Sequence, residues 1–445
     1  MPQDTALDFL GDLIAKAHRA GADEADAVLF EGVSLSHAQR LGNTEKLERA
    51  ESYDLGLRVF IGKRQAIVSS NDRGGETDAL IERAIAMAKA VPEDPYCGLA
   101  EPGEIARDWP ALDMVDPEEP APERLIERAA AAEEAARAVP GVTNSDGASA
   151  SWGRSRVAMV ASNGFAGSHA STGHSVVVSV VAGKGTAMER DDDYTSAIHA
   201  GDLRDPAAVG REAGRRAVRR LGARKIATCQ VPVVYDPRIA SSLLRHLAGA
   251  ISGPAVARGT SFLKDKLGQR LFPAGVGVID DPHKKRGLRS RPFDGEGIAN
   301  RRRAIIEDGV LTTWLLDLAS ARQLKLKSTG HAGRGTSAPP GPVPANLWLE
   351  PGPVTAQALI GDIASGFYVT ELMGHGVNGV TGDYSRGAAG FWIENGALAY
   401  PVSEVTVAGN LKEMFAHLAA ANDLEFRSGI DAPTLRIDGM TVAGA

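Results

Sequence analysis

The residues most able to do chemistry gather in one glycine-rich stretch near the C-terminal end. Residues Gly374–Gly390 read GHGVNGVTGDYSRGAAG, and the first six letters fit the G-x-G-x-x-G pattern of dinucleotide-binding loops. That pattern holds a pyrophosphate only where a strand precedes it and a helix opens inside it, because the helix N-terminus binds the phosphate. The preceding GFYVTELM predicts a strand, but more glycines and the hairpin pattern FWIENGALAY follow. The context argues against a nucleotide site.

The same stretch carries five side chains that could work without a nucleotide: His375, Asp383, Tyr384, Ser385 and Arg386. Two interpretations stay open. The loop could line a cavity and bind a peptide, or it could be a packed crossover in which the glycines let two backbones come close. Ser385, His375 and Asp383 also make a hydrolytic triad on paper. A triad requires each group to orient the next in space, and sequence spacing does not establish that.

Metal and redox chemistry find little support elsewhere in the chain. His169 and His174 lie five residues apart across a predicted turn and could face each other on paired strands, but two histidines without a third ligand make a poor metal site. The run Asp191–Asp193 predicts a solvated turn, and it lacks the ligand spacing of a calcium loop. Cys97 and Cys229 are too far apart for a CxxC motif and are expected to be reduced thiols.

One further segment places titratable groups on a predicted helix. The stretch SSLLRHLAGAIS belongs to a helix expected over Pro237–Ile251. Arg245 and His246 fall away from its apolar stripe, toward solvent or a partner. The stripe itself consists of Leu243, Leu244, Leu247 and Ile251.

Helices and hairpins alternate through the first half of the chain. A proline- and acid-rich passage, Pro92–Pro122, predicts a linker. Asn163-Gly164 is a strong two-residue hairpin signal between apolar runs. The expected helices cover residues 5–20, Thr77–Ala90, Glu123–Val139 and the arginine-rich run that ends near Arg224.

The second half is mostly β-structure. The strand CQVPVVYD opens it, and hairpin turns are predicted at Asp308-Gly309 and Asn395-Gly396. A late helix is expected over Asn410–Ala421. Helices segregated from antiparallel hairpins indicate an α+β fold, with an N-terminal α/β domain over residues 1–224 and a β-rich domain over residues 225–445.

Composition narrows the class of partner. The chain of 445 residues has 43% hydrophobic residues and a formal net charge of −7. Nucleic-acid binding is not favoured, since such proteins usually show a basic face. No apolar run approaches the 18 residues of a membrane span, and the N-terminus predicts an amphipathic helix rather than a signal peptide. We therefore expect no membrane partner and a cytoplasmic location.

Three stretches together resemble a known protein family. They are TELMGHGVNGVTGDYSRGAAGFWIENGALAYPVSEVTVAGNL, HLAGAISGPAVARGTSFLKDKLGQRLF and YDLGLRVFIGKRQA. These are similar to the TldD/PmbA family, in its PmbA (TldE) branch, and the likeness runs from about residue 10 to the end. The resemblance implies dimers, in which a TldD-like and a TldE-like chain form a zinc metalloprotease that acts on unfolded or flexible peptides. An older label of the family is modulator of DNA gyrase.

The chain departs from the family where the zinc would bind. The TldD-type subunit carries H-E-x-x-x-H on the helix that matches LLRHLAGA, and its residues fall on Arg245, His246 and Ala250. A hydrolytic zinc needs about three protein ligands and a carboxylate that takes a proton from water. The resemblance thus implies no catalytic residue and no cofactor in this chain. Zinc is expected in a TldD-like paralogue, which would be the partner in a heterodimer. A homodimer that binds peptides or acts as a scaffold without proteolysis stays the alternative.

We expect the purified chain to contain no stoichiometric zinc, because Arg245, His246 and Ala250 supply neither imidazole pair nor carboxylate in the required order. Elemental analysis of protein prepared without chelator measures this, with a TldD-like chain prepared in parallel as the positive control. One tightly held zinc per chain after dialysis would contradict the prediction.

Overall fold

The computed structural model describes residues 3–75 and 77–444 and confirms an α+β fold. Its helices are α1 (Gln3–Arg19), α2 (Thr77–Ala90), α3 (Pro122–Arg137), α4 (Pro206–Arg219), α5 (Pro237–Ala250), α6 (Gly253–Ala257), α7 (Leu318–Gln323), α8 (Ala356–Ile360) and α9 (Leu411–Ala416). Its strands are β1 (Glu24–Arg40), β2 (Asn43–Ile61), β3 (Arg64–Ser70), β4 (Val142–Ala161), β5 (Ala166–Ala182), β6 (Glu189–Ala197), β7 (Cys229–Tyr235), β8 (Val278–Asp281), β9 (Arg303–Glu307), β10 (Val310–Leu311), β11 (Ala332–Gly333), β12 (Gly341–Pro342), β13 (Asn346–Leu349), β14 (Ser365–Met373), β15 (Asp383–Glu394), β16 (Ala397–Asn410), β17 (Leu418–Ala420), β18 (Ile430–Asp431) and β19 (Leu435–Ala443).

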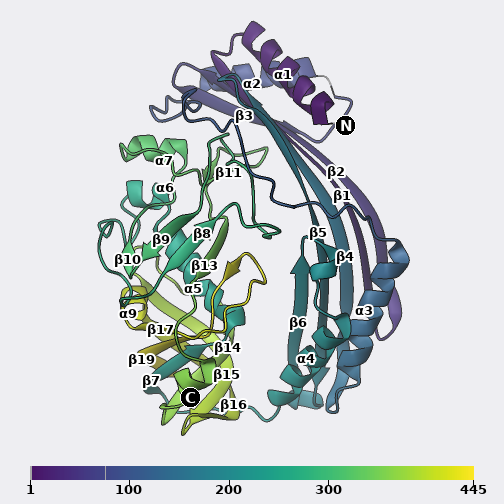
Figure 1. The fold of residues 1–445 in the computed structure, drawn as a ribbon, viewed down its shortest axis with the longest axis vertical. Helices are drawn as coiled ribbons and strands as arrows, with labels where there is room; N and C mark the ends of the chain where they lie inside the picture. Colours follow the sequence, from purple (N-terminus) through teal and green to yellow (C-terminus); the bar gives the residue numbers. More distant parts are fainter. Residues whose placement is uncertain (1–2, 76, 445) are drawn as a thin grey trace.

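The N-terminal half is one long antiparallel sheet with helices on a single face. Its strand order is β3-β2-β1-β4-β5-β6. The strands arch along one side of the molecule, and the C-terminal half lies against the concave side of the arch (Figure 1). Helices α1 and α2 pack near one end of the sheet, and α3 and α4 pack near the other.

The side-chain alternation of β1 explains this layering. Leu29 packs with α1 and α2, and Leu35 packs with α3 and α4. Val28 points the other way and packs in a cluster with Phe293 of the C-terminal half. Because successive side chains of a strand point to opposite faces, β1 is covered by helices on one face and by the second half of the chain on the other.

The C-terminal half is built from two main sheets with α5 between them. One sheet has the order β16-β15-β14-β7-β19-β17, and an additional pairing between β16 and β19 closes it on itself. The other has the order β10-β9-β8-β13-β18. Helix α5 contacts β14 of the first and both β13 and β18 of the second. The core shared by the two sheets therefore holds α5, the helix that carries Arg245, His246 and Ala250.

His169 and His174 lie on one continuous strand, β5, so the prediction of a turn between them is wrong. Gly173 does not interrupt the strand, because Gly153 of β4 pairs with it in register. Residues five apart on a strand point to opposite faces. The two rings therefore cannot share a metal ion.

Two other local predictions are also wrong. Asp191–Asp193 is not a solvated turn but part of β6, with Asp191 7% and Asp193 1% exposed. Arginine side chains supply the counter-charges of these buried carboxylates. The predicted helix over Asn410–Ala421 is shorter, since α9 ends at Ala416 and the chain enters β17 to pair with β19.

A buried ion cluster joins the two halves. Arg334, from the segment after β11, reaches Asp26 of β1, where its Nη2 lies 2.5 Å from Oδ1. Arg58 of β2 donates from Nε to Oδ2 of the same carboxylate at 2.9 Å. All three side chains are at most 4% exposed. Burial alone raises the pKa of Asp26, but the Arg334 and Arg58 guanidinium groups outweigh it and hold that pKa below its usual value.

The same segment also touches β2 through the side chain and the backbone of Thr336. Thr336 donates from Oγ1 to Asp54 Oδ2 at 2.5 Å. Gly56 of β2 lies so close that an added Cβ would sit 2.7 Å from the Thr336 Cα atom. A side chain at residue 56 would therefore push the two halves apart.

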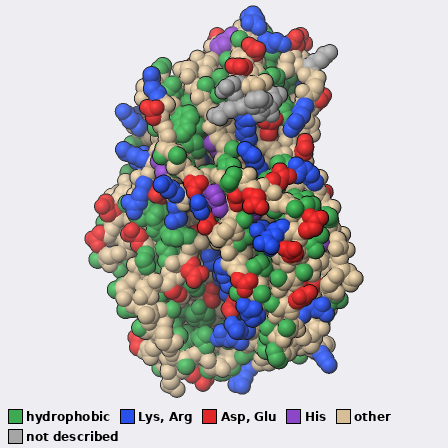
Figure 2. All heavy atoms as spheres, turned by 45° about the vertical axis from the view of Figure 1, so that its right-hand side comes forward, with side chains coloured by type: hydrophobic (Ala, Val, Ile, Leu, Met, Phe, Trp, Pro, Cys, Tyr) green, Lys and Arg blue, Asp and Glu red, His purple; other side chains and the backbone are tan. Residues whose placement is uncertain are grey.

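In the described ranges, no helix is both long and apolar enough to cross a membrane. Acidic and basic side chains are interspersed over the face drawn in Figure 2. That distribution differs from the one-sign field of a nucleic-acid-binding surface.

We expect Asp26→Asn to lower the free energy of unfolding by about 3–5 kcal/mol, because it leaves two buried guanidinium groups without a counter-charge. Since the pKa of Asp26 is lowered in the folded chain, the contribution is present above about pH 4 and lost as the pH falls below it. Urea denaturation at pH 7 and at acid pH measures both effects.

Asp78→Asn is the matched control, since Asp78 pairs with Lys16 but its side chain is 76% exposed. Exposed ion pairs contribute little. Equal stability losses for the two variants would show that the Asp26 cluster does not join the halves.

Candidate functional site

The candidate site is the face of α5 that looks toward the N-terminal sheet. The helix follows β7 directly, and Asp236 caps it by accepting from the Arg238 backbone N–H at 3.0 Å. Pro237 suits the first helical position, since its missing N–H would have no partner there. Tyr368 of β14 donates its hydroxyl to Asp236 at 3.1 Å, so the start of the helix is held by both flanking strands.

The apolar stripe of α5 lies in the core, as the sequence predicts. Its members, at most 2% exposed, are Leu243, Leu244, Leu247 and Ile251. Burying side chains of this size stabilises a fold by roughly 1.5–3 kcal/mol each, so the helix cannot rotate about its axis without a large cost. The stripe thereby decides which residues face the N-terminal half.

Arg245 lies on the exposed side of α5 and faces the seam between the two halves. Burial raises the pKa of Tyr194 of β6, and the nearby Arg427 and Arg245 guanidinium groups oppose that rise. Arg245 also acts with burial to lower the pKa of Arg289. Two turns earlier, Arg238 donates from Nη1 to Asp191 Oδ1 of β6 at 2.9 Å. Helix α5 is thus tied to the N-terminal sheet at its first turn.

His246 lies outside the apolar stripe, as predicted, but it is not fully exposed to solvent. It is half-buried, and its ring packs edge-on against Tyr384, with centroids 6.0 Å apart. Burial and the nearby Arg386 guanidinium lower the pKa of His246. The imidazole is therefore held neutral at pH 7.

The three motif positions do not fit a zinc ion. Arg245 is a cation, His246 faces Tyr384, and Ala250 is 5% exposed inside the core. Within residues 3–75 and 77–444, no group of three or more histidine, cysteine, aspartate or glutamate side chains could hold a metal ion. We therefore assign no metal chemistry to this face of α5.

The glycine-rich loop and α5 meet at Tyr384. Side chains of β15 alternate between the two faces of the strand. Tyr384 therefore lies in the core, 1% exposed, while Asp383 and Ser385 are exposed. Arg386 donates from Nε to the Met373 carbonyl at 3.1 Å. At Gly376 an added Cβ would lie 2.1 Å from the Ser385 carbonyl oxygen, so this glycine allows a close backbone crossing. Gly376 and Gly390 serve close packing, whereas an added Cβ at Gly374 or Gly379 would meet nothing within 4 Å. The peptide-binding role of the exposed residues stays a prediction.

Ser385, His375 and Asp383 do not form a hydrogen-bonded triad among the described residues. Asp383 accepts from Thr381 Oγ1 at 2.6 Å and from Asn410 Nδ2 at 3.0 Å, and neither donor is a histidine. The Ser385 backbone N–H donates to the Gly376 carbonyl at 2.7 Å. The carboxylate is thus engaged in holding the loop to β16 rather than in orienting His375.

Sequence reasoning missed an arginine cluster at the seam. Asp193 of β6 accepts from Arg204 at 2.8 Å, from Arg216 at 3.0 Å and from Arg427 at 2.7 Å. Arg427 comes from the C-terminal half, so a second ion cluster joins the halves. A cavity of about 720 Å³ opens beside it, which we call the seam cavity. Its lining residues are Tyr194, Thr195, Ser196, Asp202, Arg204, Glu212, Arg216, Glu425, Phe426 and Arg427.

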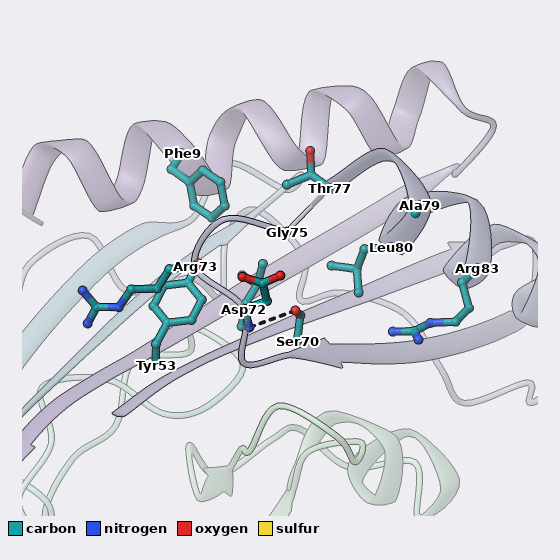
Figure 3. Close-up of a pocket in the computed structure, with 11 residues that line it drawn as sticks. Phe9, Tyr53, Ser70, Asp72, Arg73, Gly75, Thr77, Ala79, Leu80 and Arg83 are labelled. Atoms are coloured by element: carbon teal, nitrogen blue, oxygen red, sulfur yellow. Dashed lines mark hydrogen bonds between the residues drawn. The ribbon is translucent and has the colours of Figure 1, made fainter. Parts of the chain in front are cut away.

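A second pocket, of about 220 Å³, lies between the N-terminal helices and the sheet (Figure 3). It brings Phe9 of α1 and Tyr53 of β2 to the turn before α2. The polar groups of that turn are already engaged: Asp72 accepts from the Gly74 backbone at 2.9 Å, and Arg73 lies over the Tyr53 ring.

Family models match almost all of the folded chain. They describe PmbA/TldA metallopeptidases: domain 1 matches residues 25–88, the central domain 115–221 and the C-terminal domain 228–444. The chain belongs to the PmbA/TldD metallopeptidase family. The resemblance seen in the sequence is thereby confirmed.

Similar proteins agree with this assignment. The metalloprotease PmbA of Escherichia coli O157:H7 is 39% identical over 427 residues, which is 95% of this chain and 93% of the relative. A solved structure from Bacteroides thetaiotaomicron, named as a candidate modulator of DNA gyrase, has a TM-score of 0.90 at 29% identity and full coverage of both chains. TldE of Thermococcus kodakarensis has a TM-score of 0.87 at 20% identity, with 98% and 99% coverage, and shows the shared fold.

We expect the pKa of His246 to lie below its ordinary value of about 6.5 and to rise in Arg386→Gln, because one nearby positive charge is removed. The rise will be partial, since burial is the larger cause. A lowered histidine pKa stabilises the fold above pH 6.5 and loses that contribution as the pH falls. NMR titration of the imidazole ring measures the pKa of His246 in both proteins.

Arg270→Gln is the control, because Arg270 pairs with exposed Asp308 instead. An unchanged His246 titration in Arg386→Gln would show that the loop and α5 are not electrostatically linked.

Proposed function

We propose that this chain is the TldE-like, non-metal subunit of a cytoplasmic metalloprotease that processes unfolded or flexible peptides. A relative 39% identical to it is named a metalloprotease. In this proposal the metal belongs to a TldD-like paralogue, and the present chain supplies part of the wall around the peptide.

The chemistry of α5 carries the proposal. Activation of water by zinc needs ligands with lone pairs and a carboxylate that takes a proton. Arg245 has neither, His246 is turned against Tyr384, and Ala250 has only a methyl group. The face of the helix can bind or position a peptide, but it cannot generate a nucleophile.

The seam cavity supports a binding role. Its arginines are anchored to Asp193, and Arg245 of α5 lies near Tyr194, which also lines the cavity. Guanidinium groups bind carbonyl and carboxylate oxygens of a peptide with defined geometry. An extended peptide has these oxygens free, whereas a folded protein has most of its backbone groups already paired. The cavity therefore favours disordered substrates.

A non-proteolytic binding protein is the second candidate. The observation in its favour is the same α5 face, since a chain without a metal site can bind peptides with no protease beside it. The name of the Bacteroides thetaiotaomicron relative points in this direction too. The two candidates differ in whether a metal-carrying paralogue turns binding into cleavage.

We expect a fluorogenic flexible peptide to stay intact with this chain alone and to be cleaved when a TldD-like paralogue is added, because only the paralogue offers zinc ligands. Arg245→Glu should raise the KM of the two-chain enzyme several-fold at similar kcat, since it removes a cation from the seam without touching the metal. Initial rates measure both values.

Ser385→Ala is the control for hydrolysis by the glycine-rich loop, and it should leave the two-chain rate unchanged. Cleavage by the lone chain that disappears in Ser385→Ala would refute the proposal. Peptide binding with no cleavage in the presence of the paralogue would favour the second candidate.

A further inference from the structure

Basic side chains gather on the C-terminal half beside the seam cavity. They come from the segment between β8 and β9, and we call them the basic rim: Lys284, Lys285, Arg289, Arg301 and Arg302. Lys284 is half-buried and the other four are exposed. The acidic residues of the same stretch, Asp294 and Glu296, are at most 7% exposed. The surface of this stretch is therefore positive, although the whole chain has a formal net charge of −7.

The charges of the basic rim are not compensated within the chain. Among the described residues, none of its five side chains forms an ion pair with an aspartate or a glutamate. Arg286 of the same segment differs, because it donates to Asp113 and, at 3.0 Å, to Asp202, which lines the seam cavity. Arg286 thus fastens the segment beside the cavity and leaves the charges of its neighbours available to a ligand.

Two aromatic rings lie among these cations. Trp348 of β13 and Phe426 meet edge-on, with ring centroids 5.4 Å apart. The Lys284 ammonium lies 3.5 Å from the Phe426 centroid, and the Arg302 guanidinium lies 6.0 Å from the Trp348 centroid. Phe426 is 48% exposed and lines the seam cavity. A ligand that reaches Phe426 from the cavity therefore meets a cation beside each ring of the pair.

This arrangement suits a carboxylate next to an apolar group. An aromatic face attracts a cation only weakly at an exposed site, so most of the cation's charge stays uncompensated. A carboxylate beside that cation forms a charge-assisted hydrogen bond, which is among the stronger polar contacts. The half-exposed Phe426 ring meanwhile offers a hydrophobic surface to a neighbouring side chain.

The lining of the seam cavity favours a peptide over a nucleic acid. It includes the carboxylates Asp202, Glu212 and Glu425 as well as arginines. A nucleic acid carries a negative charge at every nucleotide, so a strand in the cavity would be repelled by these groups. A peptide carries carboxylates only at some of its side chains. It can place them on the basic rim and lay uncharged residues along the rest of the cavity.

We propose that the basic rim binds acidic side chains of the flexible peptide, and that Phe426 and Trp348 take an apolar side chain beside them. This inference rests on the proposed function, since the ligand is the peptide of that proposal. It narrows the substrate class to disordered peptides in which an aspartate or glutamate adjoins a large apolar residue.

Peptide binding to the full chain tests the charge preference. The probes are three fluorescently labelled peptides of equal length, built from glycine and serine with one phenylalanine, which carry glutamates, glutamines or lysines at the same positions. We expect the glutamate peptide to bind about tenfold more tightly than the glutamine peptide at low salt, and the difference to shrink as salt screens the charges. Fluorescence anisotropy measures the three Kd values.

Charge reversal assigns the preference to the basic rim. In Lys284→Glu/Arg302→Glu the Kd of the glutamate peptide should rise by about tenfold and the lysine peptide should become the better ligand, because attraction turns into repulsion. Arg302→Glu alone should shift both values in the same direction, and it disturbs only an exposed side chain. A reversed preference cannot come from a loss of folding.

Lys89→Glu is the matched control. It makes the same change of charge at an exposed residue of α2, which packs on the helix-covered face of the N-terminal sheet, away from the C-terminal half. The three Kd values should equal those of wild type. An equal effect of Lys89→Glu and Arg302→Glu would show that net charge, and not the basic rim, selects the peptide.

Phe426→Ala tests the aromatic contact. It should weaken the glutamate peptide that carries phenylalanine more than a twin in which serine replaces the phenylalanine, because only the first peptide buries a side chain on the ring. An equal loss for both peptides would overturn this part of the proposal.

Other outcomes separate this inference from the proposed function. Equal Kd values for the glutamate and glutamine peptides would overturn the inference, and so would tighter binding of an oligothymidylate than of the glutamate peptide. Cleavage of all three peptides at one rate by the two-chain enzyme would refute the acidic preference and leave the protease proposal standing. Selective binding of the glutamate peptide without cleavage after addition of the paralogue would do the reverse.

Discussion

The compensation of buried charge between the two halves of the chain is the interaction on which the architecture depends. Asp26 holds two guanidinium groups, one from each half, and Asp193 holds arginines from both as well. A buried carboxylate without its partners would destabilise the fold strongly. The N-terminal sheet and the C-terminal sheets therefore have one favourable relative position, and the seam between them is a defined surface.

The relative position of the two halves fixes the orientation of α5. The helix is clamped by its leucine stripe inside the C-terminal core and by Arg238 to Asp191 of the N-terminal sheet. Its outer face must look into the seam. In a family of metallopeptidases this is where metal ligands would matter, and here the face offers a cation and a histidine turned toward Tyr384. The fold thus brings Arg245 and His246, and not a carboxylate, to this face of the helix.

Much of the local structure follows from the order of residues. Helix α2 has the predicted bounds, and the hairpins at Asn163-Gly164 and Asn395-Gly396 follow from dipeptides that suit tight turns. The acidic run of β6 could not be read in this way. Its burial depends on arginines that come from α4 and from residue 427, far away in sequence. Only their meeting makes Asp193 a core residue rather than a turn residue.

The sequence by itself determined the family and the α+β class, because these depend on residue identity and on short-range periodicity. Tertiary structure alone decided that His246 packs on Tyr384, that Asp26 and Arg334 meet, and that β3 pairs with β2 only from Leu55 to Ile61. Each of these depends on which distant surfaces are brought together when apolar side chains leave water. Such contacts have no fixed spacing along the chain, so no local pattern reveals them.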